Sequence, residues 1–406
     1  MIASPLPSRH AGPGAESHDA RRNPRLLVLC FGNFIIGTGT LIVPGMLPAL
    51  AHGLGVTVPV AAQLITAFAF TVCITAPPLA ALTARFDRRA LLVTVQILFA
   101  GGHLASAFAS NLHQLLVLRV LSSVGAALFT AQAASTAALL VPVERRGSAI
   151  AFVFVGWSIA SVVGMPLGAY VSETAGWPVG FVIVGIGALL AAAAVHVTIP
   201  RGLMIVPIGR AMWASLFGNR RLMLAVAVTA IQAAAQFTVL SFLVPSFKTL
   251  FNATPAAISI LLVAFGATGV AGNILGARLV NRIGAAKVTL LGLVSMLASH
   301  VIWLFVPGSW LLLVVFLLLW GIGCFSTNSA QQARLVMLSP PHAPVSVAMN
   351  SSAMYFGQAV GTAAGAAVLA GVAGASAYTA LAFISVPLFV LSIVVSLLAD
   401  RKTPTA

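Results

Sequence analysis

Long runs of apolar residues, separated by short polar connections, repeat along the whole chain. Each run is close to the ~20 residues that an α-helix needs to cross the hydrocarbon core of a membrane. Several connections are very short, such as Pro307-Gly308-Ser309, which makes neighbouring helices antiparallel. The pattern predicts 12 spans, at 26–50, 58–82, 90–109, 112–141, 148–171, 178–199, 221–250, 255–279, 288–306, 310–338, 345–370 and 376–399. The fold class is therefore an all-α integral membrane protein.

Composition removes the soluble alternatives. Hydrophobic residues make up 60% of the 406 positions and charged residues 7%, whereas about 25% charge is usual in a soluble domain. A soluble enzyme and a disordered chain are both excluded. A membrane-embedded enzyme is a remote alternative, because the sequence lacks an intramembrane H-E-x-x-H or paired aspartates. The cysteines, Cys30, Cys73 and Cys324, lack the spacing of a metal site, so we expect neither metal nor cofactor.

The positions of the charges change the meaning of the basic excess. The chain has 21 Lys and Arg residues against 6 Asp and Glu residues, which in a soluble protein would suggest nucleic acid. However, 19 of the 21 lie before the first span, or at the end of an even-numbered span or in the connection after it, while Lys248 lies on the other side and Arg119 inside a span. By the positive-inside rule, both termini are cytoplasmic. The expected partner of these loops is membrane lipid rather than nucleic acid.

The chain divides into two similar halves. We expect a cytoplasmic tail at 1–25, six-helix bundles at 26–199 and 221–399, a cytoplasmic linker at 200–220 and a short tail at 400–406. With Arg85 set on Arg282, His103 and His300 each fall 18 residues later, in the third and ninth spans. A parallel duplication of a six-helix unit explains this match, and secondary transporters are built from such repeats.

Two proline-bearing spans carry the most specific signal. The fifth span reads Gly156-Trp157-Ser158-Ile159-Ala160-Ser161-Val162-Val163-Gly164-Met165-Pro166-Leu167-Gly168, and the first contains Gly39-Thr40-Leu41-Ile42-Val43-Pro44-Gly45-Met46-Leu47-Pro48. Pro166 removes a backbone donor and bends the helix, while the glycines leave a smooth face; an ordinary kinked packing helix would look the same.

Over residues 26–399 the chain resembles the major facilitator superfamily, and within it the twelve-span drug/proton antiporter branch that includes sugar and purine efflux proteins. The resemblance implies two pseudo-symmetric bundles in a monomer of the bacterial inner membrane. It also implies export by alternating access.

The loop after the second span resembles the superfamily's G-x-L-a-D-R-x-G-R-R signature, which in the family latches the cytoplasmic gate. Ala80 and Asp87 stand where glycines are usual, and Ala84 replaces the acid. Three alternatives follow: Asp87 substitutes in the latch, the latch is weak, or the arginines Arg85, Arg88 and Arg89 only hold topology. The residues assigned to gating and conformational change are Arg85, Asp87, Arg88, Arg89, Gly164, Pro166, Gly168, Gly276, Arg282 and Gly284.

Charged groups inside the membrane are few. Arg119 resembles the branch's buried arginine, and a lone arginine within a span costs about 2.5–3.5 kcal/mol on insertion scales, so we expect it to face the interior. Three roles are open for Arg119: it takes part in proton coupling, it attracts an anionic or polar substrate, or it donates structural hydrogen bonds to backbone carbonyls. The acids are Glu16, Asp19, Asp87, Glu144, Glu173 and Asp400, and none lies in the middle of a span. The candidates for proton coupling are therefore Arg119, His103 and His300, although both histidines could simply bond packed helices.

Uncharged polar side chains occur in the spans that line the central path of this family. Each is either a substrate contact or an interhelical bond, since polar groups in lipid need partners in any case. A set of amides with one arginine suits a small neutral or anionic organic molecule better than a cation. The function predicted is export by proton antiport, with an uncoupled facilitator or an importer as the alternative. The candidate substrate-binding residues are Asn33, Arg119, Gln132, Gln232, Gln236, Asn328, Gln331, Asn350, Tyr355 and Gln358.

Overall fold

A computed structural model describes residues 23–83, 85–204, 218–339 and 343–400. Within these ranges the chain forms helices, and 12 of its segments are long and apolar enough to cross a membrane, as predicted. Three of the 12 are interrupted by a short break and so consist of two helices. The α-helices are α2 (Pro24–Gly53), α3 (Val58–Ala61), α4 (Gln63–Leu82), α5 (Arg88–Ser106), α6 (Leu112–Leu139), α7 (Arg146–Thr174), α8 (Trp177–Thr198), α10 (Arg220–Leu240), α11 (Leu243–Phe251), α12 (Pro255–Ile283), α13 (Ala285–Trp303), α14 (Trp310–Leu338), α15 (Ala343–Gly371), α16 (Ser376–Ala380) and α17 (Ala382–Asp400).

Polar caps place several helix ends beyond the apolar runs. The side chain of Asn23 accepts a hydrogen bond from the backbone N–H of Arg25, and Pro24 occupies the first helical position. Asn219 and Ser309 cap α10 and α14 in the same way. A cap satisfies backbone donors that the first turn leaves free, so the helix can begin in polar sequence. For this reason α2 starts two residues earlier than hydropathy alone predicted.

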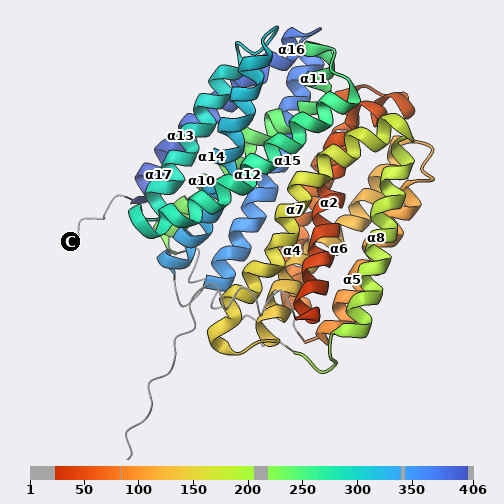
Figure 1. Cartoon of the computed structure of the whole chain (residues 1–406), viewed down its shortest axis with the longest axis vertical. Coiled ribbons are helices and arrows are strands. Elements are labelled where there is room, and N and C mark those ends of the chain that lie inside the picture. The colour runs from red at the N-terminus through yellow and green to blue at the C-terminus, as the bar shows by residue number, and fades with distance from the viewer. Residues whose placement is uncertain (1–22, 84, 205–217, 340–342, 401–406) are drawn as a thin grey trace, which may run out of the picture.

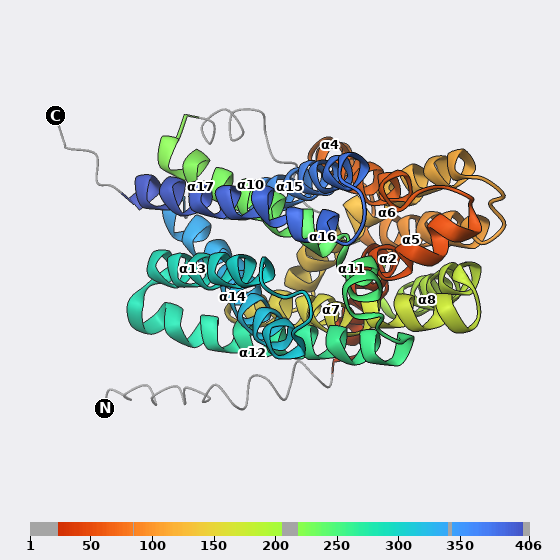
Figure 2. The same ribbon diagram turned by 90° about the horizontal axis from the view of Figure 1, so that it is seen from above.

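The helices form two groups that lie side by side (Figures 1 and 2). The N group comprises α2 to α8, in red to yellow-green, and the C group comprises α10 to α17, in green to blue. The groups meet where α4 packs on α15, α7 on α12, and α11 on α2. Because the number of spans is even, the start of α2 and the end of α17 lie on one face, here called the terminal face. The opposite face is called the distal face.

Small residues bring the first and fifth spans of each group into backbone contact. A Cβ added at Gly168 in α7 would lie 2.4 Å from the carbonyl oxygen of Ile42 in α2. At Gly365 in α15, the equivalent position of the C group, it would lie 2.6 Å from the carbonyl oxygen of Thr238 in α10. Neither separation is possible for a real side chain, so both positions require glycine. The duplication inferred from the sequence therefore extends to helix packing.

Candidate functional site

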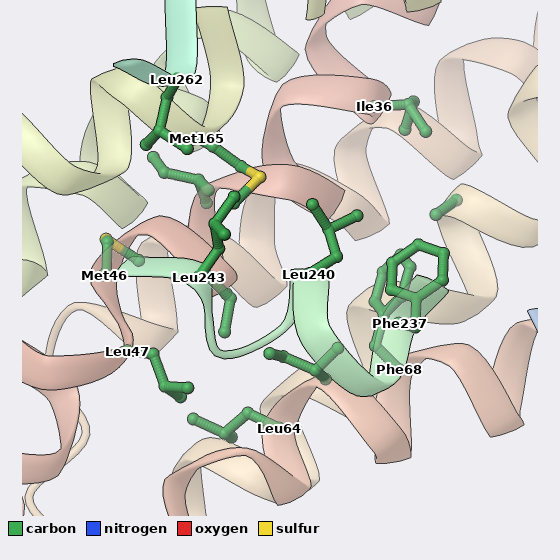
Figure 3. Packing of buried hydrophobic residues seen from close by; sticks show 14 of the residues in the cluster. Ile36, Met46, Leu47, Leu64, Phe68, Met165, Phe237, Leu240, Leu243 and Leu262 are labelled. Carbon is green, nitrogen blue, oxygen red and sulfur yellow. The ribbon is translucent and has the colours of Figure 1, made fainter. Parts of the chain in front are cut away.

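An apolar cluster joins the two groups on the distal side. Figure 3 shows Met46, Leu47, Leu64 and Phe68 of the N group facing Phe237, Leu240 and Leu243 of the C group. All of these side chains are buried. Met46 and Leu47 lie near the distal end of α2, and Leu64 lies near the distal start of α4. We call this cluster the distal seal; Met165 and Leu262 complete it.

Two polar contacts reinforce the junction at the distal face. Lys248 in α11 forms an ion pair with Glu173 at the end of α7. Nearby, the hydroxyl of Ser259 in α12 lies 3.5 Å from the carbonyl oxygen of Pro166 in α7. The ion-pair partner of Glu173 therefore comes from the other half of the chain. The distal side is therefore closed by apolar packing and by an ion pair between the groups.

Arg119 lies against the seal in the interior of the N group. Its side chain is 1% exposed, and its Cζ atom is 4.2 Å from the centre of the Phe68 ring. Nη1 donates to the carbonyl oxygen of Gly39 at 3.0 Å and approaches Nε2 of His103 at 3.4 Å. The predicted inward orientation of Arg119 is confirmed by these contacts with α2, α4 and α5.

The hydrogen bonds of His103 fix its tautomer. Nδ1 lies 2.9 Å from the carbonyl oxygen of Phe99 and must donate, because a carbonyl only accepts. Nε2 is then the lone-pair nitrogen that accepts from Arg119. The other ring neighbours of His103 are Phe99 and Phe181, so Arg119 is the charged group that contacts it among the described residues. His103 is thus neutral and directly joined to Arg119.

His300 makes the same hydrogen bond as His103, from Nδ1 to the carbonyl oxygen four residues earlier, but its other neighbours differ. Its Nδ1 lies 2.9 Å from the carbonyl oxygen of Met296, while its Nε2 has no hydrogen-bond partner among the described residues. Phe316, Trp320 and Phe389 surround the ring, with centroid distances of 5.7, 4.8 and 4.6 Å. The alignment that sets His103 on His300 sets Arg119 on Phe316. At this repeated position, therefore, the N group carries a cation and the C group an aromatic ring.

Two predicted polar residues of the N group bind neighbouring helices. Asn33 donates to the carbonyl oxygen of Val153 at 3.0 Å and accepts from Thr130 at 2.8 Å, so it joins α2, α6 and α7. Gln132 accepts a hydrogen bond from the buried Arg88. In this state both side chains serve as interhelical bonds.

Most predicted amides of the C group are also engaged. Gln331 donates to the carbonyl oxygen of Ala225 at 2.5 Å and to Thr229 at 3.3 Å, and Thr229 in turn donates to Asn350 at 2.5 Å. This chain links α14, α10 and α15. Gln232 donates to Gln236 at 3.3 Å on the same face of α10, as their four-residue spacing indicated.

Three predicted residues have no side-chain hydrogen bond within the described ranges. Asn328 in α14 and Tyr355 in α15 are half-buried, and Gln358 in α15 is 2% exposed. The Tyr355 ring meets Phe68 edge-on across the boundary between the groups, with centroids 6.4 Å apart. Phe68 therefore contacts Arg119 on one side and the C group on the other. No periodicity or motif identified Phe68 in the sequence, because an apolar residue in a span looks like every other.

The loop after the second span is organised by capping. Asp87 accepts from the backbone N–H of Ala90 at 3.0 Å and from that of Gly202 at 2.6 Å, so both carboxylate oxygens bind backbone of the N half. Arg88 is buried and donates to the carbonyl oxygen of Thr83 at 3.0 Å. Arg85 is exposed and Arg89 half-buried. Asp87 is therefore a helix cap that also holds the chain after α8, and a latch remains a prediction.

The predicted gating residues of the second copy fall into two kinds. Gly276 packs α12 against α14, since an added Cβ would lie 2.8 Å from the Ser326 Cα atom. Gly284 joins α12 to α13 with a φ of 86°, which favours glycine. Arg282 is exposed. In α7, Gly164, Pro166 and Gly168 are all buried against α2 or α12.

Twelve membrane-spanning segments in two equivalent groups, joined around a buried polar interior, define a membrane transporter of the secondary type. The chain belongs to the Major Facilitator Superfamily, whose profile matches residues 29–252 and 226–406. This is a family of transporters and not of enzymes.

Relatives and solved structures agree with this assignment. The MFS-type transporter YbcL of Bacillus subtilis is 27% identical over 352 residues, covering 87% of this chain and 90% of the relative. The inner membrane transport protein YdhP of Escherichia coli K12 is 29% identical over 354 residues, covering 86% and 89%. A bacterial homologue of the human lysosomal transporter Spinster, crystallised inward-facing and unoccupied, superposes with a TM-score of 0.73 at 17% identity, covering 97% of this chain and 100% of that one. The human organic anion transporter MFSD10 gives 0.69 at 16% identity, covering 93% and 99%.

Proposed function

We propose that this protein exports a small neutral or anionic organic molecule across the inner membrane by alternating access, in exchange for protons. In this proposal it belongs to the drug/proton antiporter branch, both termini are cytoplasmic, and the distal face is periplasmic. The 19 basic residues before the first span and at or after the ends of even-numbered spans support the orientation. The similarity to the inner membrane protein YdhP supports the location.

The closed distal side supports alternating access. Apolar packing and the Lys248–Glu173 pair join the N and C groups there, and Arg119 and Tyr355 flank Phe68 at the inner edge of the seal. A rocking motion of the two groups would open this junction and close the terminal side. Under this proposal the structure represents the state that is shut toward the periplasm.

The contact between Arg119 and His103 is the observation that carries the coupling. A proton on Nε2 of His103 would replace an acceptor by a donor and place two positive charges together. At 4 Å such a pair repels by about 4 kcal/mol at an effective dielectric constant of 20. Arg119 would then leave the carbonyl oxygen of Gly39. In this proposal Arg119 faces the substrate, so its movement changes the binding site. Substrate and proton would thus exclude one another, as antiport requires.

An uncoupled facilitator is the second candidate, because no acid lies in the middle of a span. A measurement of substrate flux under a pH gradient distinguishes the facilitator from the antiporter. A screen of a deletion strain against toxic sugars, nucleosides and antibiotics would supply a substrate. Purified protein in liposomes would then be loaded with that substrate and exposed to an imposed pH gradient. We expect a gradient with acid outside to drive exchange in wild type and not in His103→Gln. Flux that ignores the gradient would overturn antiport and leave the facilitator.

A further inference from the structure

One edge of the Arg119 guanidinium is unused. Nη1 makes both hydrogen bonds of the side chain, to Gly39 and to His103. Nε and Nη2 are buried and have no hydrogen-bond partner among the described residues. Their N–H bonds lie on the same side of the planar group and form the fork that matches two oxygens of a carboxylate. Buried donors are rarely left unpaired, so this edge calls for an acceptor.

The described residues around Arg119 supply no counter-charge. Arg119 makes no ion pair within the described part of the protein. The acid Glu173 is paired with Lys248, Asp400 with Arg334, and Asp87 binds backbone. Neutral His103 adds no negative charge. A buried cation without an acid is costly, and an anion from outside the chain would remove that cost.

Arg334 provides the contrast within the same molecule. It is 3% exposed and so almost as buried as Arg119. Its Nη2 donates to Asp400 at 2.8 Å and to the carbonyl oxygen of Ser396 at 3.0 Å, and its Nη1 donates to the hydroxyl of Ser396. Arg334 thus carries its own carboxylate, and among its nitrogens Nε alone has no hydrogen-bond partner within the described residues. Arg119 has no ion pair within the described residues and leaves both Nε and Nη2 unpaired, although it lies at the boundary of the two groups through Phe68.

We propose that Arg119 binds the anionic group of the transported molecule, and that this group is a carboxylate or another anion with two coplanar oxygens. The proposal rests on the proposed transport function and narrows its substrate from neutral or anionic to anionic. The Phe68 ring covers one face of the guanidinium, and the apolar distal seal adjoins it. The substrate is therefore an amphiphile, with its charged end on Arg119 and its apolar part toward the seal. Phe68 also contacts Tyr355 of the C group, so in this proposal the anion binds next to the contact between the N and C groups.

The test uses full-length protein in nanodiscs and probe pairs that differ in charge alone. Acetate, benzoate and octanoate are compared with acetamide, benzamide and octanamide by calorimetry at pH 8 and by thermal unfolding. We expect at least one carboxylate to bind and its amide to bind ten- to hundred-fold more weakly, as for a lost hydrogen bond to a charged group. If each carboxylate bound with the same affinity as its amide, or if no carboxylate bound at all, the measurement on wild-type protein would already overturn the proposal.

Variants assign the effect to the fork. Arg119→Lys keeps the charge and loses the planar pair of donors, so we expect carboxylate affinity to fall about tenfold or more. Arg334→Lys is the matched control and should bind as wild type does. Carboxylate binding that survives in Arg119→Lys and Arg119→Met would overturn the proposal, because the anion would then sit elsewhere.

Binding and flux, measured on the same protein, separate the two proposals. Carboxylate binding that depends on Arg119, in a protein whose substrate flux ignores the pH gradient, would uphold the anion site and overturn antiport. Gradient-driven export of neutral compounds alone, with no binding of any carboxylate, would uphold the transport function and overturn the anion site.

Discussion

Reversing one charge of the Lys248–Glu173 pair should open the distal side. The two side chains are 31% and 27% exposed, so the pair is partly shielded from water. Exposed ion pairs contribute about 0.2–1 kcal/mol, which corresponds to a roughly 1.5- to 5-fold bias toward the closed state. Glu173→Gln removes that attraction. Glu173→Lys replaces it by a repulsion of similar size, so the bias should fall by up to about 30-fold.

Opening can be followed by chemical access to the seal. A cysteine at Leu243, which is buried in the distal seal, would react with a membrane-impermeant maleimide added at the distal face once the groups separate. Cys30, Cys73 and Cys324 are replaced beforehand, since they are free thiols. We expect labelling to quicken modestly in Glu173→Gln and strongly in Glu173→Lys.

The exchanged pair supplies the control. In Glu173→Lys with Lys248→Glu, the attraction is restored with the charges swapped, so the labelling rate should return toward that of the parent protein. Unchanged labelling in Glu173→Lys would show that apolar packing alone holds the distal side shut. If the double variant were labelled as fast as Glu173→Lys alone, loss of the ion pair would not be the cause of the faster labelling.

Three further changes test individual positions. Gly168→Ala should reduce flux in liposomes much more than Gly164→Ala, because the added Cβ meets a backbone oxygen at 2.4 Å in the first and a side-chain carbon at 3.0 Å in the second; equal flux would contradict this. Asp87→Ala removes the cap of α5 and should lower the free energy of unfolding by about 0.5–2 kcal/mol, seen as a lower Tm, while the exposed Arg85→Ala should not. His300→Gln should leave the pH dependence of flux intact, whereas loss of that dependence would place a proton site in the C group.

The sequence predicted the fold closely because membrane solvation constrains it strongly. Every backbone polar group in lipid must bond within its own helix, so length and hydropathy suffice to place the spans. The predicted edges differ from the helices by a few residues where polar caps extend a helix, as at Asn23. The duplication was visible in the sequence because Arg85 matches Arg282 and His103 matches His300 at the same offset, and the packing of Gly168 and Gly365 follows the same symmetry.

The candidate site was predicted in its residue types but not in its connections. Arg119 was singled out by its cost in a span, and its inward position is confirmed. The sequence could not separate His103 from His300, since both occupy equivalent places. Their difference comes from the residue at the next helix, arginine in one half and phenylalanine in the other.

By itself, the sequence determined how many times the chain crosses the membrane and which residues are costly there, because both depend on transfer from water to lipid. It also marked the scarcity of acids among the spans. Tertiary structure alone decided which polar groups satisfy one another: Asn33, Gln331 and Asn350 bind neighbouring helices, while Arg119 keeps one edge free. Hydrogen bonds between helices depend on rotation and distance to about an ångström, and hydropathy along a single chain carries no information at that scale.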